Sequence, residues 1–446
     1  MPNFINIKKK IKNFNKSITV DGDKSISIRS LIFASLANGV SIIENLLESE
    51  DIFHTIDALK KLGVKIRKNK KKYIINGLGI NNFKYKKNII IHAGNSGTLA
   101  RLILGLLIKS PYKIKIIGDK SLSKRDISRI VNPLSKFEAE FFPKNKNTLP
   151  LAIRKIDSIK KNKFLENKGS AQVKSSIMLA ALHYKNETEI LAKKSRNHTE
   201  NFFKFLNIPI KIKKNKKYDL IKIKGVDKFK SFNYNIPADI SSGLFFIAMT
   251  ILSNKSKLNL KKININSSRM GAIDILKKMG VKFKFRNKKK YKGEIISDIQ
   301  VKSPKKLNSI NCPSSMNSRA IDEFLIIFLI AAKARGISYF KDIGELNHKE
   351  SPRLKVASKF LRMIGVQNYS TNDSIKIIGN PNLKLNGNYV MNNYLKDHRV
   401  FMMSTIAALT LGGNWKIYDP ECSRTSFPSF LKLVKKIGGK FKLYKK

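Results

Sequence analysis

The sequence contains few cysteines and no long apolar run, and each absence excludes a class of protein. Its two cysteines, Cys312 and Cys422, lie far apart in the chain, which excludes a disulfide scaffold and a cysteine-based zinc motif. The longest apolar stretches, Phe324–Ala332 and Leu244–Leu252, have nine residues each, whereas a membrane-spanning helix needs roughly 18. The first residues contain no apolar signal core. We therefore expect a cytoplasmic protein that does not contact a membrane.

Acidic residues are also scarce, because 31 Asp and Glu residues accompany 89 Lys and Arg residues, giving a net charge of +58. Such an excess would suit a basic nucleic-acid-binding protein, since Lys and Arg neutralise phosphates. The lysines are, however, spread along the whole chain, and the densest runs (68–72, 211–217 and 286–292) lie between apolar strand-like segments, as hairpin tips do. We interpret the excess as a solvated surface and expect no nucleic-acid partner. Nucleic-acid binding stays the alternative from another class, and small anionic substrates suit the charge equally well.

An internal repeat organises the chain. A phrase of the type Leu-Gly-Val-Lys-Ile, first at 62–66, returns at 279–283, 364–367 and 437–441, each time between a helix-like and a strand-like stretch. In phase with it, a short polar turn opens an apolar helix at intervals of roughly 75 residues. The turns are at Asp23, Gly94, Gly169, Asp239, Asp322 and Asp397, and the expected helices span 25–37, 96–107, 170–182, 240–252, 321–332 and 398–411.

These helices are apolar on most faces, which predicts that they are buried. One repeat is too small to bury its own faces, so the copies must pack together. Three copies per domain predict two α/β domains with a boundary near 235–237.

The helix openings carry residues that suit anions. Backbone N–H groups are unpaired at a helix N-terminus and favour negative charge. Lys24, Ser25 and Arg29 stand at the first opening, Gly94–Thr98 with Arg101 at the second, and Ser170 with Gln172 and Lys174 at the third. Asp322 at the fifth opening, the segment 349–353 and the triplet 397–399 add carboxylates, cations and a histidine. We therefore expect an anion-binding cleft at these openings.

Four short motifs resemble those of the 5-enolpyruvylshikimate-3-phosphate synthase family, and their residues are closer to the class II branch of that family. They are Gly-Asp-Lys-Ser-Ile-Ser at 22–27 with Arg29, Ser-Ala-Gln-Val-Lys-Ser at 170–175, His-Lys-Glu at 348–350 with Arg353, and Asp-His-Arg at 397–399. The resemblance runs from about Ile18 to Phe441. It implies an enolpyruvyl-transferase-like fold of six βαβαββ repeats around buried helices, an inside-out α/β barrel with three repeats per domain. The domains implied are 22–237 and 1–21 with 238–446, and the active site is expected in the cleft between them.

The resemblance also implies a reaction. The enolpyruvyl group of phosphoenolpyruvate moves to the 5-hydroxyl of shikimate 3-phosphate and phosphate is released, on the route to chorismate and aromatic amino acids. No cofactor and no metal are expected, and we expect a monomer. The implied catalytic residues are Asp322 as the base and Glu350 as the acid, with Lys24 as a rival acid. The implied substrate contacts are Lys24, Ser25, Arg29, Asn95, Gly97, Arg125, Ser170, Gln172, Arg196, Asp322, Lys349, Arg353, His398 and Arg399.

Some positions depart from the family pattern. Asn347 precedes the His-Lys-Glu phrase, Pro352 stands where Asp is usual, Asp126 replaces a Pro, and Glu421 stands where many class I members have a Lys. Gly97, where tolerant class II members tend to have Ala, predicts that glyphosate competes with phosphoenolpyruvate, although Leu102 departs from the usual Pro of sensitive members. The UDP-N-acetylglucosamine enolpyruvyl transferases share the fold and stay the alternative, but the stretch 120–125 lacks the Cys of their catalytic loop.

Overall fold

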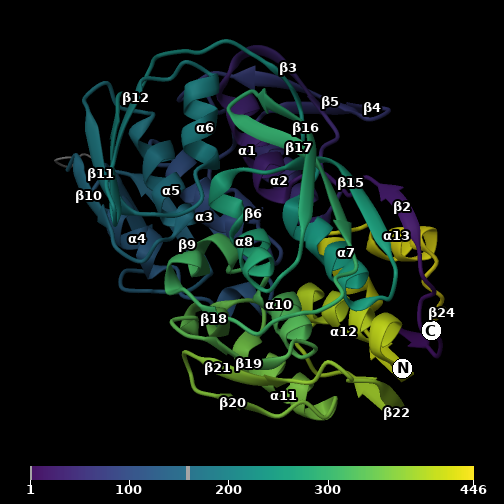
Figure 1. The fold of residues 1–446 in the computed structure, drawn as a ribbon. Helices are drawn as coiled ribbons and strands as arrows, with labels where there is room; N and C mark the ends of the chain where they lie inside the picture. The colour runs from purple at the N-terminus through teal and green to yellow at the C-terminus, as the bar shows by residue number, and fades with distance from the viewer. Residues whose placement is uncertain (1–2, 157–160, 446) are drawn as a thin grey trace. The chain divides into compact units, whose positions relative to one another are not determined.

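The structure is a computed structural model that describes residues 3–156 and 161–445 (Figure 1). Its contacts divide the chain into two units, which we describe separately. The first-half unit contains the described residues of Gly22–Ile236 together with Lys290–Glu294. The second-half unit contains 3–21, 237–289 and 295–445. Among the described residues, no helix combines the length and the apolar character that a membrane crossing requires.

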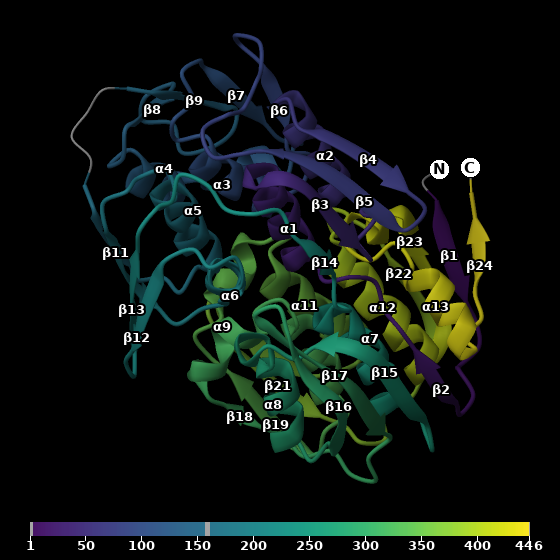
Figure 2. The ribbon, with the colours of Figure 1, turned by 90° about the horizontal axis from the view of Figure 1, so that it is seen from above.

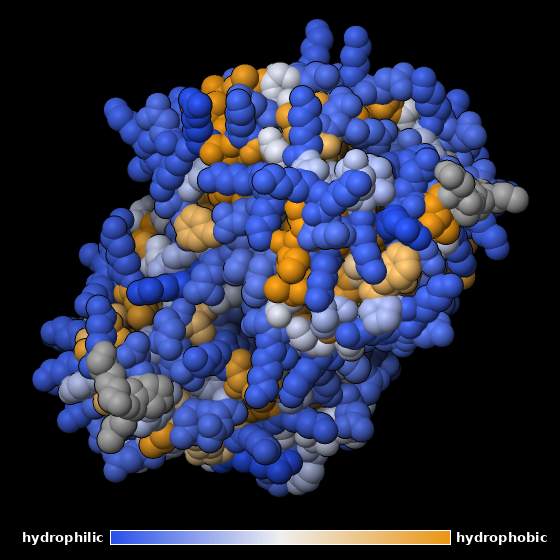
Figure 3. Space-filling model, turned by 180° about the vertical axis from the view of Figure 1, so that it is seen from behind, coloured by the Kyte–Doolittle hydropathy of each residue, from blue (hydrophilic) through white to orange (hydrophobic). Residues whose placement is uncertain are grey.

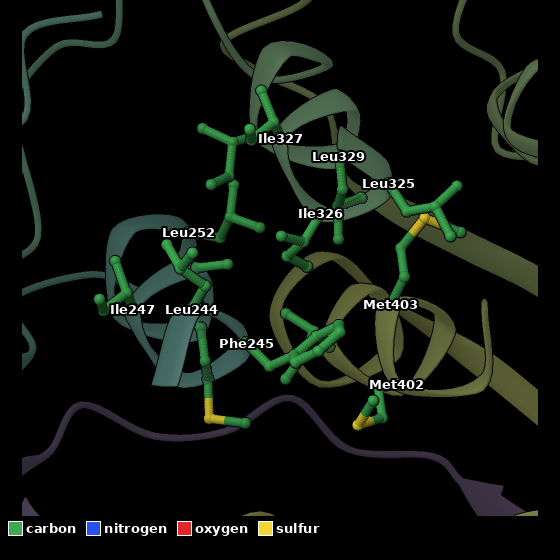
Figure 4. Close-up of a cluster of buried hydrophobic side chains, with 14 of the residues drawn as sticks. Leu244, Phe245, Ile247, Leu252, Leu325, Ile326, Ile327, Leu329, Met402 and Met403 are labelled. Carbon is green, nitrogen blue, oxygen red and sulfur yellow. The ribbon is translucent and has the colours of Figure 1, made fainter. Parts of the chain in front are cut away.

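Three buried helices form the centre of each unit. Those of the first-half unit are α1 (Lys24–Leu36), α3 (Gly97–Leu106) and α5 (Ala171–Ala181), and those of the second-half unit are α7 (Ile240–Leu252), α10 (Phe324–Ala331) and α12 (His398–Leu411). Every residue of α7, α10 and α12 is buried, as expected for helices that are apolar all round. Figure 4 shows side chains of these three helices, among them Leu244, Phe245, Ile326 and Met403, gathered into one apolar core.

Side-chain caps explain where most of these helices begin. Asp23 accepts a hydrogen bond from the Ile26 N–H at 3.0 Å, and Asp239 and Asp397 cap α7 and α12 in the same manner. The hydroxyls of Ser96 and Ser170 cap α3 and α5. Such caps satisfy N–H groups that have no partner inside the helix. The same residues therefore begin the buried helices and stand beside the side chains expected to bind anions.

The first-half unit has three four-stranded sheets among its described residues. Their orders are β14-β3-β5-β4, β6-β7-β9-β8 and β10-β11-β13-β12. The strands are β3 (Asn38–Glu44), β4 (Lys65–Asn69), β5 (Lys72–Leu78), β6 (Ile90–His92), β7 (Ile114–Ile117), β8 (Ala139–Phe142), β9 (Leu151–Lys155), β10 (Lys163–Glu166), β11 (Thr188–Lys193), β12 (Ile210–Lys214), β13 (Tyr218–Ile223) and β14 (Asn233–Asn235).

The described residues of the second-half unit likewise form three four-stranded sheets, in the orders β16-β17-β15-β2, β18-β19-β21-β20 and β22-β23-β1-β24. The strands are β1 (Phe4–Ile7), β2 (Asn15–Ile18), β15 (Lys257–Asn264), β16 (Phe283–Tyr291), β17 (Glu294–Lys302), β18 (Asn311–Cys312), β19 (Gly336–Phe340), β20 (Asn368–Ser370), β21 (Ile375–Gly379), β22 (Leu385–Met391), β23 (Gly412–Tyr418) and β24 (Lys442–Tyr444).

All six sheets follow one βαβαββ plan within the described residues. The first two strands run parallel around a buried helix, and a second helix leads to the last pair. The second helices are α2 (Glu50–Lys61), α4 (Ser128–Leu134), α6 (His198–Phe205), α8 (Gly271–Lys278), α11 (Arg353–Met363) and α13 (Phe430–Ile437). The sequence prediction of six βαβαββ repeats agrees with this plan.

The repeats are not all continuous in sequence. β14, from the end of the first half, is the first strand of the sheet that contains β3, and β2 has the same position beside β15. The last sheet is completed by β1, which pairs with both β23 and β24, so that the two ends of the chain lie side by side in it (Figure 2).

The lysine-rich runs reach the expected turns but also extend along strands. Lys68–Lys72 spans the β4–β5 turn, 211–217 covers the end of β12 and the turn before β13, and 286–292 lies mainly in β16 and reaches the β16–β17 turn only at Lys292. Side chains from hydrophilic residues cover most of the face shown in Figure 3.

Two details differ from the sequence prediction. The fifth helix does not run continuously from Ile321, because α9 (Asn317–Ala320) precedes a turn and α10 begins only at Phe324. The reason is that Glu323, at the N-cap position, makes no cap bond and instead accepts a hydrogen bond from the Ser241 hydroxyl. In addition, Lys290–Glu294 cluster with the first-half unit, because Glu294 contacts His198 and Asn201.

Candidate active site

The opening of α1 places two cations in the first-half unit. Lys24 is the first residue of the helix, and its Nζ lies 3.0 Å from Asp51 Oδ2 at the start of α2. The Lys24 side chain is 21% exposed, whereas that of Asp51 is 5% exposed. Asp51 therefore holds Lys24 in place while leaving part of its ammonium accessible to a ligand.

Arg29 lies one turn further along α1 and is 4% exposed. Its Nε donates to Thr199 Oγ1 at 2.8 Å, and its two terminal nitrogens donate to the Ser25 carbonyl at 3.0 Å and to Ser175 Oγ at 2.9 Å. All three acceptors are neutral oxygens. Burial lowers the pKa of Arg29 to about 10, although the more distant Glu200 and Asp23 oppose this shift.

The opening of α3 forms a small pocket around Gly97. Asn95 connects two charged residues, because its amide nitrogen donates to Asp119 at 2.6 Å and its oxygen accepts from Arg125 at 2.7 Å. A Cβ on Gly97 would lie 2.7 Å from one nitrogen of Arg101 and 3.3 Å from one of Arg125. The pocket is lined by Gly97, Ala100, Arg101, Leu122, Arg125, Asp126, Ile127 and Leu149. Its guanidinium groups and missing side chain suit a small anion.

The opening of α5 is joined to that of α3. Gln172 accepts a hydrogen bond from Arg101 at 2.7 Å and donates one to Thr98 at 2.8 Å. Glu166 is buried just before Ser170 and accepts from the N–H groups of Lys168, Gly169 and Ser170, each at 3.0 Å. This internal carboxylate fixes the loop from which Ser170 caps the helix. Arg196 is half-buried and lies two residues before α6.

Asp322, in the second-half unit, lies in the turn between α9 and α10 beside two cations. The Lys349 Nζ is 3.5 Å and an Arg353 terminal nitrogen is 3.8 Å from its Oδ1. Glu350 lies 2.5 Å from the other terminal nitrogen of Arg353. The side chains of Asp322, Lys349 and Glu350 are about a fifth exposed, so both carboxylates can reach a ligand.

Asp397 is the buried carboxylate that holds Arg353 in this cluster. It is buried and accepts two hydrogen bonds from Arg353, at 2.8 and 3.2 Å, and one from the Ser351 hydroxyl at 2.9 Å. Burial opposes ionisation of Asp397, but Arg353 outweighs it and holds the pKa of the carboxyl below its ordinary value. Burial would also lower the pKa of Arg353, yet Asp397 and Glu350 together raise it.

His398 and Arg399 are the first two residues of α12, and both are buried. The Arg399 N–H donates to Asp397 Oδ1 at 2.9 Å, so the carboxylate that holds the Arg353 side chain also fixes the backbone of Arg399. Glu421 lies in a short helical turn, Pro420–Thr425, after β23.

The structure brings most of the predicted residues into two clusters. Asn95, Gly97, Arg125 and Gln172 are joined in the first-half unit, and Asp322, Lys349, Glu350 and Arg353 in the second-half unit. Four residues that contact predicted ones were absent from the predicted contacts: Asp51, Arg101, Asp119 and Asp397. Arg101 stood in the second motif, and Asp51 follows an acidic helix start, but nothing local marked Asp119, whose partner is 24 positions away.

The departure at Asp126 has a structural account. Its two carboxylate oxygens accept from the backbone N–H and the hydroxyl of Ser128 at 2.8 and 2.9 Å, an arrangement that turns the chain into α4. Pro352 stands at the N-cap position of α11, directly before Arg353. Neither residue removes a charge from the clusters.

A metal site is not evident in the described part of the chain, where no three His, Cys, Asp or Glu side chains converge in a metal-binding group. The described residues of the clusters thus offer cations and hydrogen-bond donors for anionic ligands, and carboxylates for proton transfer.

Comparisons with known proteins give a consistent result. The family described as EPSP synthase (3-phosphoshikimate 1-carboxyvinyltransferase) matches residues 8–433. A 3-phosphoshikimate 1-carboxyvinyltransferase of Ruthia magnifica subsp. Calyptogena magnifica is 38% identical, over 94% of this chain and 95% of that protein. One from Thermodesulfovibrio yellowstonii is 37% identical, over 96% of this chain and 98% of that protein.

Solved structures agree. The EPSP synthase from Acinetobacter baumannii has a TM-score of 0.85 at 32% identity and covers 99% of this chain and 100% of its own. The enolpyruvyl transferase NikO from Streptomyces tendae has a TM-score of 0.76 at 12% identity, with 99% of each chain covered, and shows likeness of fold alone. The predicted fold class, an enolpyruvyl-transferase-like α/β fold built from βαβαββ repeats, is confirmed.

Proposed function

The chain belongs to the EPSP synthase family, and from this premise we propose how its residues carry out the family's reaction. That reaction joins the 5-hydroxyl of shikimate 3-phosphate to the enolpyruvyl group of phosphoenolpyruvate and releases phosphate. It places the protein among the transferases of the shikimate pathway, which leads to chorismate and the aromatic amino acids. We assign anion binding mainly to the first-half cluster and proton transfer mainly to the second-half cluster.

Shikimate 3-phosphate is held by the openings of α1, α5 and α6. Lys24, Ser25 and Ser170 offer an ammonium and two hydroxyls, Gln172 an amide, and Arg196 a guanidinium. Arg29 makes three hydrogen bonds inside the protein, so it contributes its positive charge from beneath the binding surface and fixes the Ser25 carbonyl. Lys349 adds a further cation from the second-half cluster.

Phosphoenolpyruvate occupies the Gly97 pocket. Arg125 and Asn95 hold one end of this anion, and Arg353 and Arg399 contribute positive charge from the second-half cluster. The bare Gly97 lets the ends of Arg101 and Arg125 lie against the start of α3, where a Cβ would crowd them. For the same reason we propose that glyphosate competes with phosphoenolpyruvate here.

Two proton transfers accompany the addition. Asp322 takes the proton of the 5-hydroxyl as that oxygen bonds to C2 of phosphoenolpyruvate, and Glu350 gives a proton to C3, which becomes a methyl group. Lys24 is the alternative donor to C3. The tetrahedral intermediate then breaks its bond to phosphate, which leaves with the proton that Asp322 had taken, and the methyl carbon returns a proton to Glu350. Lys349 and Arg353 stabilise the negative charges that gather at the site during both steps.

The observation that carries this assignment is the position of Asp322. Its carboxylate is a fifth exposed, stands in a turn and lies 3.5 Å from Lys349 and 3.8 Å from Arg353. The N-cap position of α10 belongs to Glu323, so Asp322 stands one residue before the cap, beside the two cations. We infer that its partly exposed carboxylate serves as the base.

The test is phosphate release from purified protein supplied with both substrates. Wild type should release phosphate only when both are present, and Asp322→Asn should lose at least about a thousandfold in kcat. Asp342→Asn is a matched control, because Asp342 is exposed and has a φ of 59°, which Asn tolerates. Full activity of Asp322→Asn, with its fold verified by circular dichroism, would contradict the assignment of the base.

A third arm replaces shikimate 3-phosphate with UDP-N-acetylglucosamine. Phosphate release in that arm alone would favour the sister activity. Retention of nucleic acid that survives high salt would favour the other-class alternative, since non-specific polyanion binding weakens as salt rises. A monomeric state and a cytoplasmic location stay predictions, which sizing chromatography and cell fractionation can check.

A further inference from the structure

We propose that Glu294 and His198 form a buried positioning pair that sets the shikimate 3-phosphate contacts of the first-half unit. The inference rests on the proposed function, because it concerns how the same binding residues are held. Neither side chain has a role in the chemistry described above. Both belong to the first-half unit, although Glu294 lies 96 positions after His198.

The pair is sealed from solvent. His198 is the first residue of α6, and its Nδ1 lies 2.8 Å from Glu294 Oε1, each side chain being 1% exposed. The Asn201 amide donates to the same carboxylate oxygen at 3.1 Å. A carboxylate in such a place is costly without hydrogen-bond donors. Glu294 therefore fixes the first turn of α6 through two of its side chains, His198 and Asn201.

The segment that delivers Glu294 fits this place closely. Gly293 has a φ of +85°, and a Cβ on it would lie 2.6 Å from the Asn201 carbonyl oxygen. The Tyr291 hydroxyl accepts a hydrogen bond from the Asn235 N–H at 2.8 Å, and the Lys292 ammonium donates to the Asn233 carbonyl. Residues 290–294 thus make backbone and side-chain contacts beside α6, which hold the carboxylate in one position.

The next residue of α6 touches the binding site. Thr199 Oγ1 accepts from Arg29 Nε at 2.8 Å and lies 2.7 Å from Ser175 Oγ, so it connects α6 with α1 and α5. Arg196 lies two residues before His198. Because Glu294 anchors the first turn of α6 through His198 and Asn201, loss of these contacts would loosen the turn that carries both Thr199 and Arg196. The pair therefore acts on shikimate 3-phosphate through these two residues, and not by contact.

Affinity measurements on three variants test the pair. Calorimetric titration with shikimate 3-phosphate should give a Kd about tenfold higher for Glu294→Gln and for His198→Leu than for wild type, since each leaves a buried polar partner unmatched. His198→Asn, whose amide nitrogen can donate from about the position of Nδ1, should stay within about threefold of wild type. Glu187→Gln is the control, since the partly exposed Glu187 pairs with Lys222, and it should not change the Kd.

Steady-state kinetics separates positioning from general damage. In the variants, KM for shikimate 3-phosphate should rise with Kd, while kcat and KM for phosphoenolpyruvate stay within about twofold of wild type. Loss of folded protein would instead lower the binding stoichiometry and kcat, with an unchanged Kd in what remains. An unchanged Kd in both Glu294→Gln and His198→Leu overturns the inference, and so does an equal rise in His198→Asn and His198→Leu. Failure of wild type itself to bind shikimate 3-phosphate would overturn the proposed function instead.

Discussion

Arg29 in the first-half unit and Arg353 in the second-half unit are both buried arginines, but their surroundings differ. Arg29 is 4% exposed and donates to two hydroxyls and a carbonyl, whereas Arg353 is 1% exposed and contacts three carboxylates. Burial lowers the pKa of Arg29 to about 10. At Arg353 the carboxylates of Asp397 and Glu350 outweigh burial, so its pKa is raised.

The protein therefore neutralises the charge of Arg353 with its own carboxylates, whereas the charge of Arg29 is left for an anionic ligand. Buried charges are stabilised only when opposite charges or hydrogen bonds replace water. Arg29 has the hydrogen bonds but no carboxylate within ion-pair distance among the described residues. A phosphate bound above it would supply the missing negative charge. Arg353 holds Asp322 and Glu350 in place through its carboxylate contacts, and it adds only part of its charge to the phosphoenolpyruvate site.

The largest expected effect comes from removing each guanidinium in turn. Arg353→Met leaves Asp397 buried without its cation and should lower the free energy of unfolding by about 3–5 kcal/mol. Arg29→Met should lower it by less than about 1 kcal/mol, because Ser175 and Thr199 still hydrogen-bond each other at 2.7 Å. Urea unfolding followed by circular dichroism measures both. Equal losses of unfolding free energy in the two variants would contradict the proposed difference between Arg29 and Arg353.

Asp397→Asn tests the ion pair with Arg353 through the pH dependence of stability. The pKa of Asp397 is below its ordinary value of 3.8, so its contribution to stability is fully present above pH 3.8 and is lost as pH falls through the lower, folded-state value. We expect the variant to be about 2–3 kcal/mol less stable than wild type at pH 7, and the gap to narrow below pH 3.8. Unfolding curves at several pH values check this, and a gap independent of pH would contradict it.

Gly97→Ala should give the smallest effect. Its Cβ would lie 2.7 Å from the end of Arg101 and 3.3 Å from the end of Arg125, both of which are flexible tips that can shift. We expect KM for phosphoenolpyruvate to rise about fivefold and the glyphosate inhibition constant to rise by more, with stability within about 0.5 kcal/mol of wild type. Inhibition assays at fixed shikimate 3-phosphate compare the two constants. If neither KM nor the inhibition constant changed, the assignment of Gly97 to the phosphoenolpyruvate site would be contradicted.

Local sequence signals predicted the elements well. The polar turn before an apolar run gave the observed bounds of α7 and α12, because Asp239 and Asp397 are true caps. The same signal misplaced the fifth helix, since Glu323 stands at its N-cap position without making a side-chain cap bond. A carboxylate beside an apolar run looks alike in sequence whether it caps the helix or points elsewhere.

The contacts that organise the site were beyond the sequence. Arg353 and Asp397 are 44 positions apart, and Arg29 and Thr199 are 170 apart. The sequence shows that arginines and carboxylates are present, but only the packed helices decide which of them meet. The contrast between a neutralised and an unneutralised arginine therefore became visible in the structure alone.

The strand exchange in the sheets has a consequence for synthesis on the ribosome. β1 and β2 emerge long before the strands that they pair with, which are β23 and β24 for β1 and β15 for β2. The edges of both strands stay unpaired until later residues have been made. In contrast, the segments from α1 to β14, which contain nearly all of the first-half unit, are synthesised much earlier. A nascent chain is thus exposed to wrong pairing at β1 and β2 until those partners are made, and a short deletion in β1 should harm the sheet that contains β23 and β24.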